Sequence, residues 1–111
     1  MIIDFSKIAE QNLPAFKGGQ GAMLAKMYFD GKNRVIMGKL VPGSSIGFHK
    51  HEMNSELIYI LSGTGTVKLE QGEEIVQPGQ VHYCPQGSSH ALCNEGTEDL
   101  TFYAVVPEHH Q

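Results

Sequence analysis

The chain alternates between short apolar runs and polar turn segments. From residue 22 onward, runs of β-branched, aromatic and aliphatic residues are separated every eight to twelve residues by Gly, Pro, Asn or Ser. This pattern is typical of an all-β sandwich or barrel, and no stretch of helical period competes with it. We expect strands over residues 23–29, 34–41, 47–51, 57–61, 66–69, 74–77, 81–84, 90–94 and 100–106.

Two of the turns have the sequence of a β-hairpin. Asp30-Gly31 separates the first two runs, and Gln71-Gly72 lies between Leu69 and Glu74. Glycine takes a positive φ at such positions without strain, so both turns predict antiparallel neighbours.

The two ends of the chain lack strand patterning. We expect residues 1–21 to form an arm, with one or two helical turns over residues 6–12, capped by Ser6 and ended by Pro14, and a flexible connector over residues 17–21. Residues 22–106 then form the barrel, and residues 107–111 form a frayed tail in which His109 and His110 bind no native metal. Residues 1–111 are therefore expected to form a single domain.

Composition narrows the class of protein. The chain has 111 residues, 41% of them hydrophobic and 18% charged, which suits one globular unit. A net charge of -4 with eight scattered basic residues argues against nucleic acid and membrane partners. The start resembles no secretory signal and no apolar stretch reaches membrane-spanning length, so we expect a cytoplasmic protein in which Cys84 and Cys93 stay reduced.

Four residues could form a metal centre. His49 and His51 are two residues apart on a strand and therefore point to one face. Glu56 opens the next run, and His90 begins a distant one. Three imidazoles and a carboxylate suit a divalent first-row metal. The alternative is that these histidines are hydrogen-bonded core residues that hold no metal.

Two motifs resemble those of the cupin family. The first, of the form Gly, His-x-His, Glu, Gly, is matched at its spacing by Gly43, His49, His51, Glu56 and Gly63. The second is matched by Gly79, Pro85, Gly87, His90 and Asn94, and the fifteen residues between the motifs match small microbial cupins.

The resemblance implies a fold and a cofactor. The fold is all-β, a double-stranded β-helix (jelly-roll β-barrel) with a short N-terminal arm. The cofactor is one divalent transition-metal ion, namely Fe, Mn, Ni, Cu or Zn, held inside one open end of the barrel by His49, His51, Glu56 and His90.

Strand alternation predicts what surrounds the ion. Gly47 should leave space beside the metal for a small molecule, and Ile58, Ile60 and Leu92 should line the substrate pocket. Plain core packing is the alternative for these aliphatic residues. The opposite face carries Leu57, Tyr59 and Leu61, which predicts cover by a second copy in a homodimer.

The remaining polar residues near the site have simpler expected roles. We expect His82 to be a hydrogen-bonded barrel histidine rather than a fifth ligand or a general base. Glu52 should be a solvated loop carboxylate, and Cys93 should point outward.

Two classes of function are compatible with such a site. A metal-dependent enzyme would act on a small oxygen-bearing molecule, as dioxygenases, isomerases, decarboxylases and lyases among cupins do. A non-catalytic module would bind a small ligand for storage or sensing. A nearby acid or base would distinguish them, and the candidates are His82, Tyr103 and Glu52.

Overall fold

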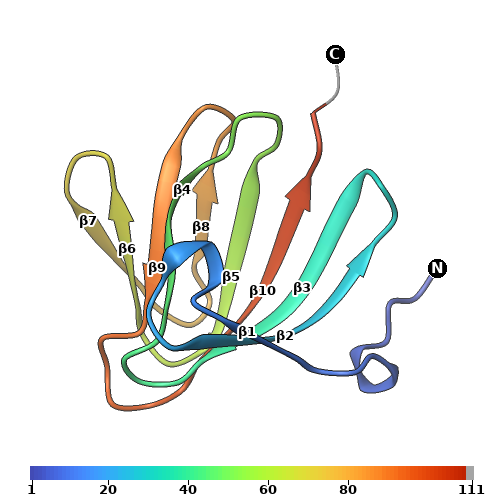
Figure 1. The fold of residues 1–111 in the computed structure, drawn as a ribbon, viewed down its shortest axis with the longest axis horizontal. Helices are drawn as coiled ribbons and strands as arrows, with labels where there is room; N and C mark the ends of the chain where they lie inside the picture. The colour runs from blue at the N-terminus through green and yellow to red at the C-terminus, as the bar shows by residue number, and fades with distance from the viewer. Residues whose placement is uncertain (110–111) are drawn as a thin grey trace.

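Two antiparallel β-sheets form the protein, of which a computed structural model describes residues 1–109 (Figure 1). One sheet has the strand order β1-β2-β3-β10-β5-β8 and the other has the order β4-β9-β6-β7. The strands are β1 (Gln11–Pro14), β2 (Ala22–Phe29), β3 (Asn33–Leu40), β4 (Ser45–Lys50), β5 (Glu56–Ser62), β6 (Gly65–Leu69), β7 (Glu73–Val76), β8 (Val81–Cys84), β9 (Ser89–Cys93) and β10 (Leu100–Pro107). This arrangement is a double-stranded β-helix.

Each of the nine predicted runs overlaps one of the strands β2 to β10. Both predicted hairpins are confirmed. Gly31 and Gly72 have φ angles of 91° and 87°, and the Asp30 carboxylate accepts hydrogen bonds from the backbone N–H groups of Lys32 and Asn33 at 2.9 and 2.8 Å. The turn chemistry therefore fixes the pairing of β2 with β3 and of β6 with β7.

The interpretation of residues 6–12 as helical turns capped by Ser6 is wrong. A short 3₁₀ turn, η1 (Phe5–Lys7), is capped by Asp4, and residues 11–14 form β1, which pairs with β2. Pro14 ends a strand rather than a helix, as proline can at a sheet edge, where no partner needs its missing N–H.

The expected flexible connector at residues 17–21 is packed against the barrel. A second 3₁₀ turn, η2 (Phe16–Gly18), contacts β4. A Cβ atom added at Gly19 would lie 2.0 Å from the Ser45 carbonyl oxygen, so only glycine permits this approach.

The tail is also more ordered than expected. Glu108 forms an isolated bridge with Asn54, and the His109 backbone N–H donates to the Met53 carbonyl at 2.8 Å. Residues 107–109 are therefore attached to the loop before β5, while residues 110–111 lie outside the described part.

The core lies between the sheets, and β5 shows how alternation builds it. Ile58 and Ile60 are buried at 1% and 0% exposure, whereas Leu57, Tyr59 and Leu61 face outward as predicted. Glu56, the first residue of β5, faces inward with Ile58 and Ile60, which places a carboxylate beside the apolar core. Within residues 1–109, no helix has the length and apolar character to cross a membrane.

Candidate metal centre

The fold brings His49, His51, Glu56 and His90 together between the two sheets. His49 on β4 is paired with His90 on β9, His51 follows β4, and Glu56 begins β5 of the opposite sheet. The four donor atoms all lie within 4.8 Å of one another. His51, Glu56 and His90 are between 2% and 7% exposed, so the cluster is buried apart from His49.

The donor spacing suits a first-row ion. The Nε2 atoms of His51 and His90 lie 3.2 and 3.0 Å from the same Glu56 oxygen, and 3.0 Å from each other. Donors about 2.1 Å from a common ion and at right angles to one another lie about 3.0 Å apart. The chemistry and spacing of the donor set therefore fit a divalent transition metal.

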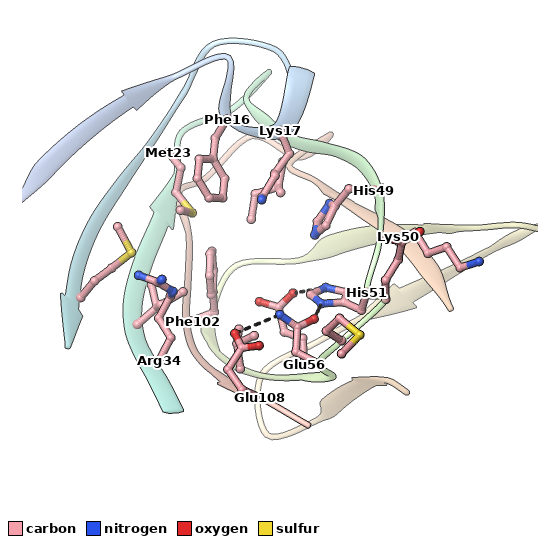
Figure 2. A pocket seen from close by; sticks show the side chains of 17 residues that line it. Phe16, Lys17, Met23, Arg34, His49, Lys50, His51, Glu56, Phe102 and Glu108 are labelled. Carbon is pink, nitrogen blue, oxygen red and sulfur yellow. Dashed lines mark hydrogen bonds and ion pairs between the residues drawn. The ribbon is translucent and has the colours of Figure 1, made fainter. Parts of the chain in front are cut away.

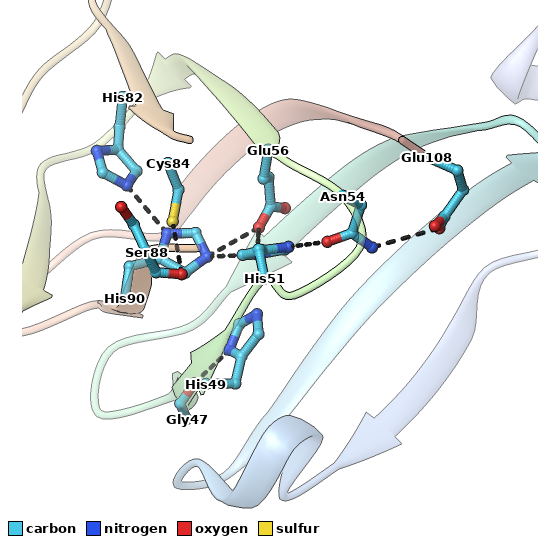
Figure 3. Close-up of polar contacts among 10 residues, drawn as sticks. All are labelled: Gly47, His49, His51, Asn54, Glu56, His82, Cys84, Ser88, His90 and Glu108. Carbon is cyan, nitrogen blue, oxygen red and sulfur yellow. Dashed lines mark hydrogen bonds and ion pairs between the residues drawn. The ribbon is translucent and has the colours of Figure 1, made fainter. Parts of the chain in front are cut away.

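A hydrogen bond fixes the outer nitrogen of each cluster histidine (Figure 3). His49 Nδ1 donates to the Gly47 carbonyl at 2.7 Å, and His51 Nδ1 donates to Asn54 Oδ1 at 2.5 Å. Asn54 in turn donates from Nδ2 to Glu108 at 3.3 Å, which leaves its oxygen for His51. A proton held on Nδ1 leaves the Nε2 lone pair free to bind an ion.

His82 is the hydrogen-bond partner of the outer nitrogen of His90, in agreement with its predicted role as a hydrogen-bonded barrel histidine. Its Nε2 lies 2.9 Å from His90 Nδ1, and the residue is 8% exposed. Cys84 lies next to this pair but its thiol faces the Ser88 carbonyl at 3.6 Å, and burial raises its pKa to about 11. Both cysteines are free, and the thiol of Cys84 is protonated at neutral pH.

The charges of the cluster are set by burial and hydrogen bonding. Burial alone would raise the pKa of Glu56, but the hydrogen bonds with His51 and His90 outweigh it and hold that pKa at about 2. The Glu56 hydrogen bond raises the pKa of His51 against the effect of burial, whereas burial lowers the pKa of His49. The centre therefore contains a carboxylate anion, which a cation can neutralise.

The cluster lies in the wall of a cavity of about 550 Å³ (Figure 2). The lining includes three of the cluster residues, His49, His51 and Glu56. The rest of the wall comes from η2, β2, β3, β4, the loop before β5, β10 and the residue after it: Phe16, Lys17, Met23, Met27, Arg34, Ile36, Ile46, Lys50, Glu52, Met53, Asn54, Phe102, Val106 and Glu108.

The four residues predicted to line the pocket lie elsewhere. Ile58, Ile60 and Leu92 belong to the apolar core, as the alternative interpretation had it. The space expected at Gly47 is filled, because a Cβ there would lie 2.0 Å from the Lys17 carbonyl oxygen. A register shift between Ile46 and His49 also breaks the alternation from which Gly47 was placed.

Of the other two acid or base candidates, one lies away from the site and one is a solvated loop residue as expected. Tyr103 lies on the outer face of the sheet, where its ring stacks on Phe5 at 5.7 Å, so it is not at the site. Glu52 is an exposed loop residue, as expected, and it also lines the cavity. The alternation of side chains along β3 could have placed Arg34 at the cavity, because Arg34 lies two residues before the inward-facing Ile36.

Asn54 offers a direct test of the outer hydrogen bonds. Replacing Asn54 with alanine is expected to lower metal affinity by about 10–100-fold, since His51 loses the partner that orients its ring. Calorimetric titration with Zn²⁺ or Mn²⁺ measures the change, and Asn12→Ala, at an exposed position in β1, is the matched control. Equal affinity in both variants would show that the Asn54 contact does not position His51.

Comparison with known proteins identifies the family. The family model described as "Cupin domain" matches residues 36–106, which contain the whole cluster. An oxalate-binding protein from Thermotoga maritima is 36% identical over 113 residues, covering 96% of this chain and 93% of that protein. The crystal structure of a predicted oxalate decarboxylase from Thermotoga maritima has a TM-score of 0.89 and 32% identity, covering 97% of this chain and 99% of the other.

More distant structures share the architecture alone. The cupin domain of Cnp3 from Schizosaccharomyces pombe has a TM-score of 0.78 at 14% identity, covering 97% of this chain and 74% of that chain. The motifs, the double-stranded β-helix and these matches agree with one another. The chain belongs to the cupin superfamily as a small cupin domain.

Proposed function

We propose that the protein holds one divalent transition-metal ion with His49, His51, Glu56 and His90 and uses it to bind a small carboxylate such as oxalate. The observation that carries the proposal is the set of donor atoms beside a cavity open to a ligand. The Nε2 atoms of His51 and His90 lie 3.2 and 3.0 Å from the same Glu56 oxygen. The similarity to an oxalate-binding protein supports the class of ligand.

The ion would supply Lewis acidity, and redox chemistry if it is Fe, Mn, Cu or Ni. The remaining work belongs to the chain. His49, His51 and His90 would keep Nε2 directed inward through their Nδ1 hydrogen bonds, and the Glu56 carboxylate would supply the fourth ligand.

Turnover of the carboxylate is the second candidate function. Glu52 and Glu108 line the same cavity, so their carboxyl groups lie where a proton could be exchanged with a bound substrate. A decarboxylase would use such a group, whereas a storage or sensory module would not need one. Dioxygenase, isomerase and lyase chemistry remain variants of this second candidate.

Titration of the metal-loaded and metal-free protein with oxalate tests the proposal. Oxalate is expected to bind only when a stoichiometric ion is present, with a dissociation constant that depends on the metal. Carbon-13 spectroscopy of labelled oxalate then separates the candidates, because turnover releases formate and carbon dioxide. A protein that takes up no metal, or that binds oxalate equally well without it, would contradict the proposal.

We further propose that the protein acts in the cytoplasm as a homodimer. Free Cys84 and Cys93 suit a reducing compartment. The outer face of β5, β8 and β10 supports the dimer, because it exposes six large apolar or aromatic residues at 38–57% each: Leu57, Tyr59, Leu61, Val81, Tyr83 and Tyr103. Light scattering measures the mass in solution, and a monomer at micromolar concentration would contradict the dimer.

A further inference from the structure

Three basic side chains line the cavity, Lys17, Arg34 and Lys50, and the metal centre needs none of them. Arg34 lies on the wall opposite His49 and His51 (Figure 2). The ion pairs found among residues 1–109 join other side chains. Cations that line a cavity and have no carboxylate paired to them in this part of the chain suit an anionic ligand.

The surroundings of Arg34 and of Lys17 are known from two kinds of contact. The Arg34 guanidinium lies 4.2 Å from the centre of the Phe29 ring, which supports one face and leaves the N–H edges available. Lys17 lies in η2 with a left-handed φ of 54°, and its carbonyl packs against Gly47. η2 contacts β4, which carries His49, and the Lys17 side chain lies beside His49 in the cavity wall (Figure 2), so Lys17 lies at the metal end of the cavity.

The balance of charge favours anions once an ion is bound. Three cations (Lys17, Arg34, Lys50) and three carboxylates (Glu52, Glu56, Glu108) line the cavity. Their charges cancel, so a divalent ion leaves the site positive. Glu108 is in addition held by Asn54 at 3.3 Å rather than by Arg34.

The cavity is also larger than oxalate requires. Its volume of about 550 Å³ lies in the range of pockets that hold drug-sized ligands. Oxalate consists of two joined carboxylates and has no apolar part. The cavity wall, however, includes eight apolar side chains: Phe16, Met23, Met27, Ile36, Ile46, Met53, Phe102 and Val106. An apolar segment of ligand would remove this surface from water.

We propose that the preferred ligand is a dicarboxylic acid longer than oxalate, with a chelating 2-oxo- or 2-hydroxyacid end. This proposal rests on the proposed metal centre. The chelating end binds at the cluster, where Lys17 offsets its charge. The apolar chain crosses the middle of the cavity, and the distal carboxylate forms a paired hydrogen bond with the Arg34 guanidinium.

A matched set of acids tests the proposal on the full-length, Mn²⁺-loaded protein. Calorimetry compares oxalate, 2-oxohexanoate and 2-oxoadipate, of which the last two have equal length and differ by the distal carboxylate. In the native chain 2-oxoadipate is expected to bind about tenfold or more tightly than 2-oxohexanoate. In Arg34→Gln this difference should vanish, while the affinity for oxalate stays within about twofold.

Two further variants sharpen the result. Lys17→Gln is expected to weaken all three acids together, since Lys17 lies at the metal end. Lys32→Gln, an exposed lysine outside the cavity, is the matched control and should change none of them. Thermal melting confirms that each variant folds.

The outcomes separate the two proposals. The longer ligand is ruled out if 2-oxoadipate binds no better than 2-oxohexanoate, or if Arg34→Gln weakens oxalate as much as 2-oxoadipate. If no acid binds the metal-loaded protein, the proposed metal-dependent function itself fails. Binding of oxalate alone would retain that function and overturn the dicarboxylate inference.

Discussion

Replacing His90 with alanine is expected to abolish tight metal binding. His90 is 2% exposed, its Nε2 lies 3.0 Å from both His51 Nε2 and Glu56 Oε1, and its Nδ1 is bonded to His82. The change removes a ligand as well as its oriented ring, so the loss should exceed the about 10–100-fold that follows from removing an outer partner. Elemental analysis after dialysis, together with competition against a chelator, measures the loss.

Two companion variants make this result interpretable. Glu56→Gln keeps the shape of the site but removes the charge, and it should also lose metal strongly without leaving a cavity. His109→Ala is the control, because His109 bonds to Ser55 Oγ at 2.8 Å and lies outside the cluster. Native metal content in His90→Ala, with native content in the control, would contradict the assignment of the centre.

Replacing Phe102 with alanine is expected to cost the largest amount of stability, about 3–5 kcal/mol of the free energy of unfolding. Phe102 is 1% exposed on β10, between β3 and β5. Its ring lies over Gly38, where an added Cβ would come within 2.4 Å of the ring, so no neighbour can fill the space left. Urea denaturation of the metal-free protein measures the change.

The control for this prediction is another phenylalanine. Phe48 on β4 is 52% exposed, so Phe48→Ala should change the stability by no more than about 0.5 kcal/mol. A loss below about 1 kcal/mol in Phe102→Ala would mean that the core collapses around the missing ring.

The strands and three of the four cluster residues were predictable from local sequence patterns, whereas His90 was predicted from the resemblance to the second cupin motif. Alternation along β5 places Glu56 inward with Ile58 and Ile60, and two-residue spacing places His49 and His51 together at the cavity. Hairpin glycines such as Gly31 and Gly72 define the turns by their conformational freedom alone. No contact between distant residues is needed for these predictions.

The walls of the cavity were not predictable in the same way. η2 is held by contacts between residues far apart in sequence, of Gly19 with Ser45 and of Lys17 with Gly47. A short polar segment with several glycines has no period that would reveal them, so it resembles a linker. The tail was missed for the same reason, since the contacts of Glu108 and His109 are with the distant loop before β5.

The residues that would bind the ion and the residues that would select the ligand lie in different parts of the chain. The two parts meet where η2 packs against β4. The cluster lies wholly within residues 36–106, whereas Phe16, Lys17, Met23, Met27 and Arg34 precede them and form the facing wall. Because η2 meets β4 through backbone and glycine contacts, the exposed Lys17 side chain can change without disturbing the ligand strands. Substitution at such positions of the facing wall is thus a route by which one metal scaffold acquires new specificities.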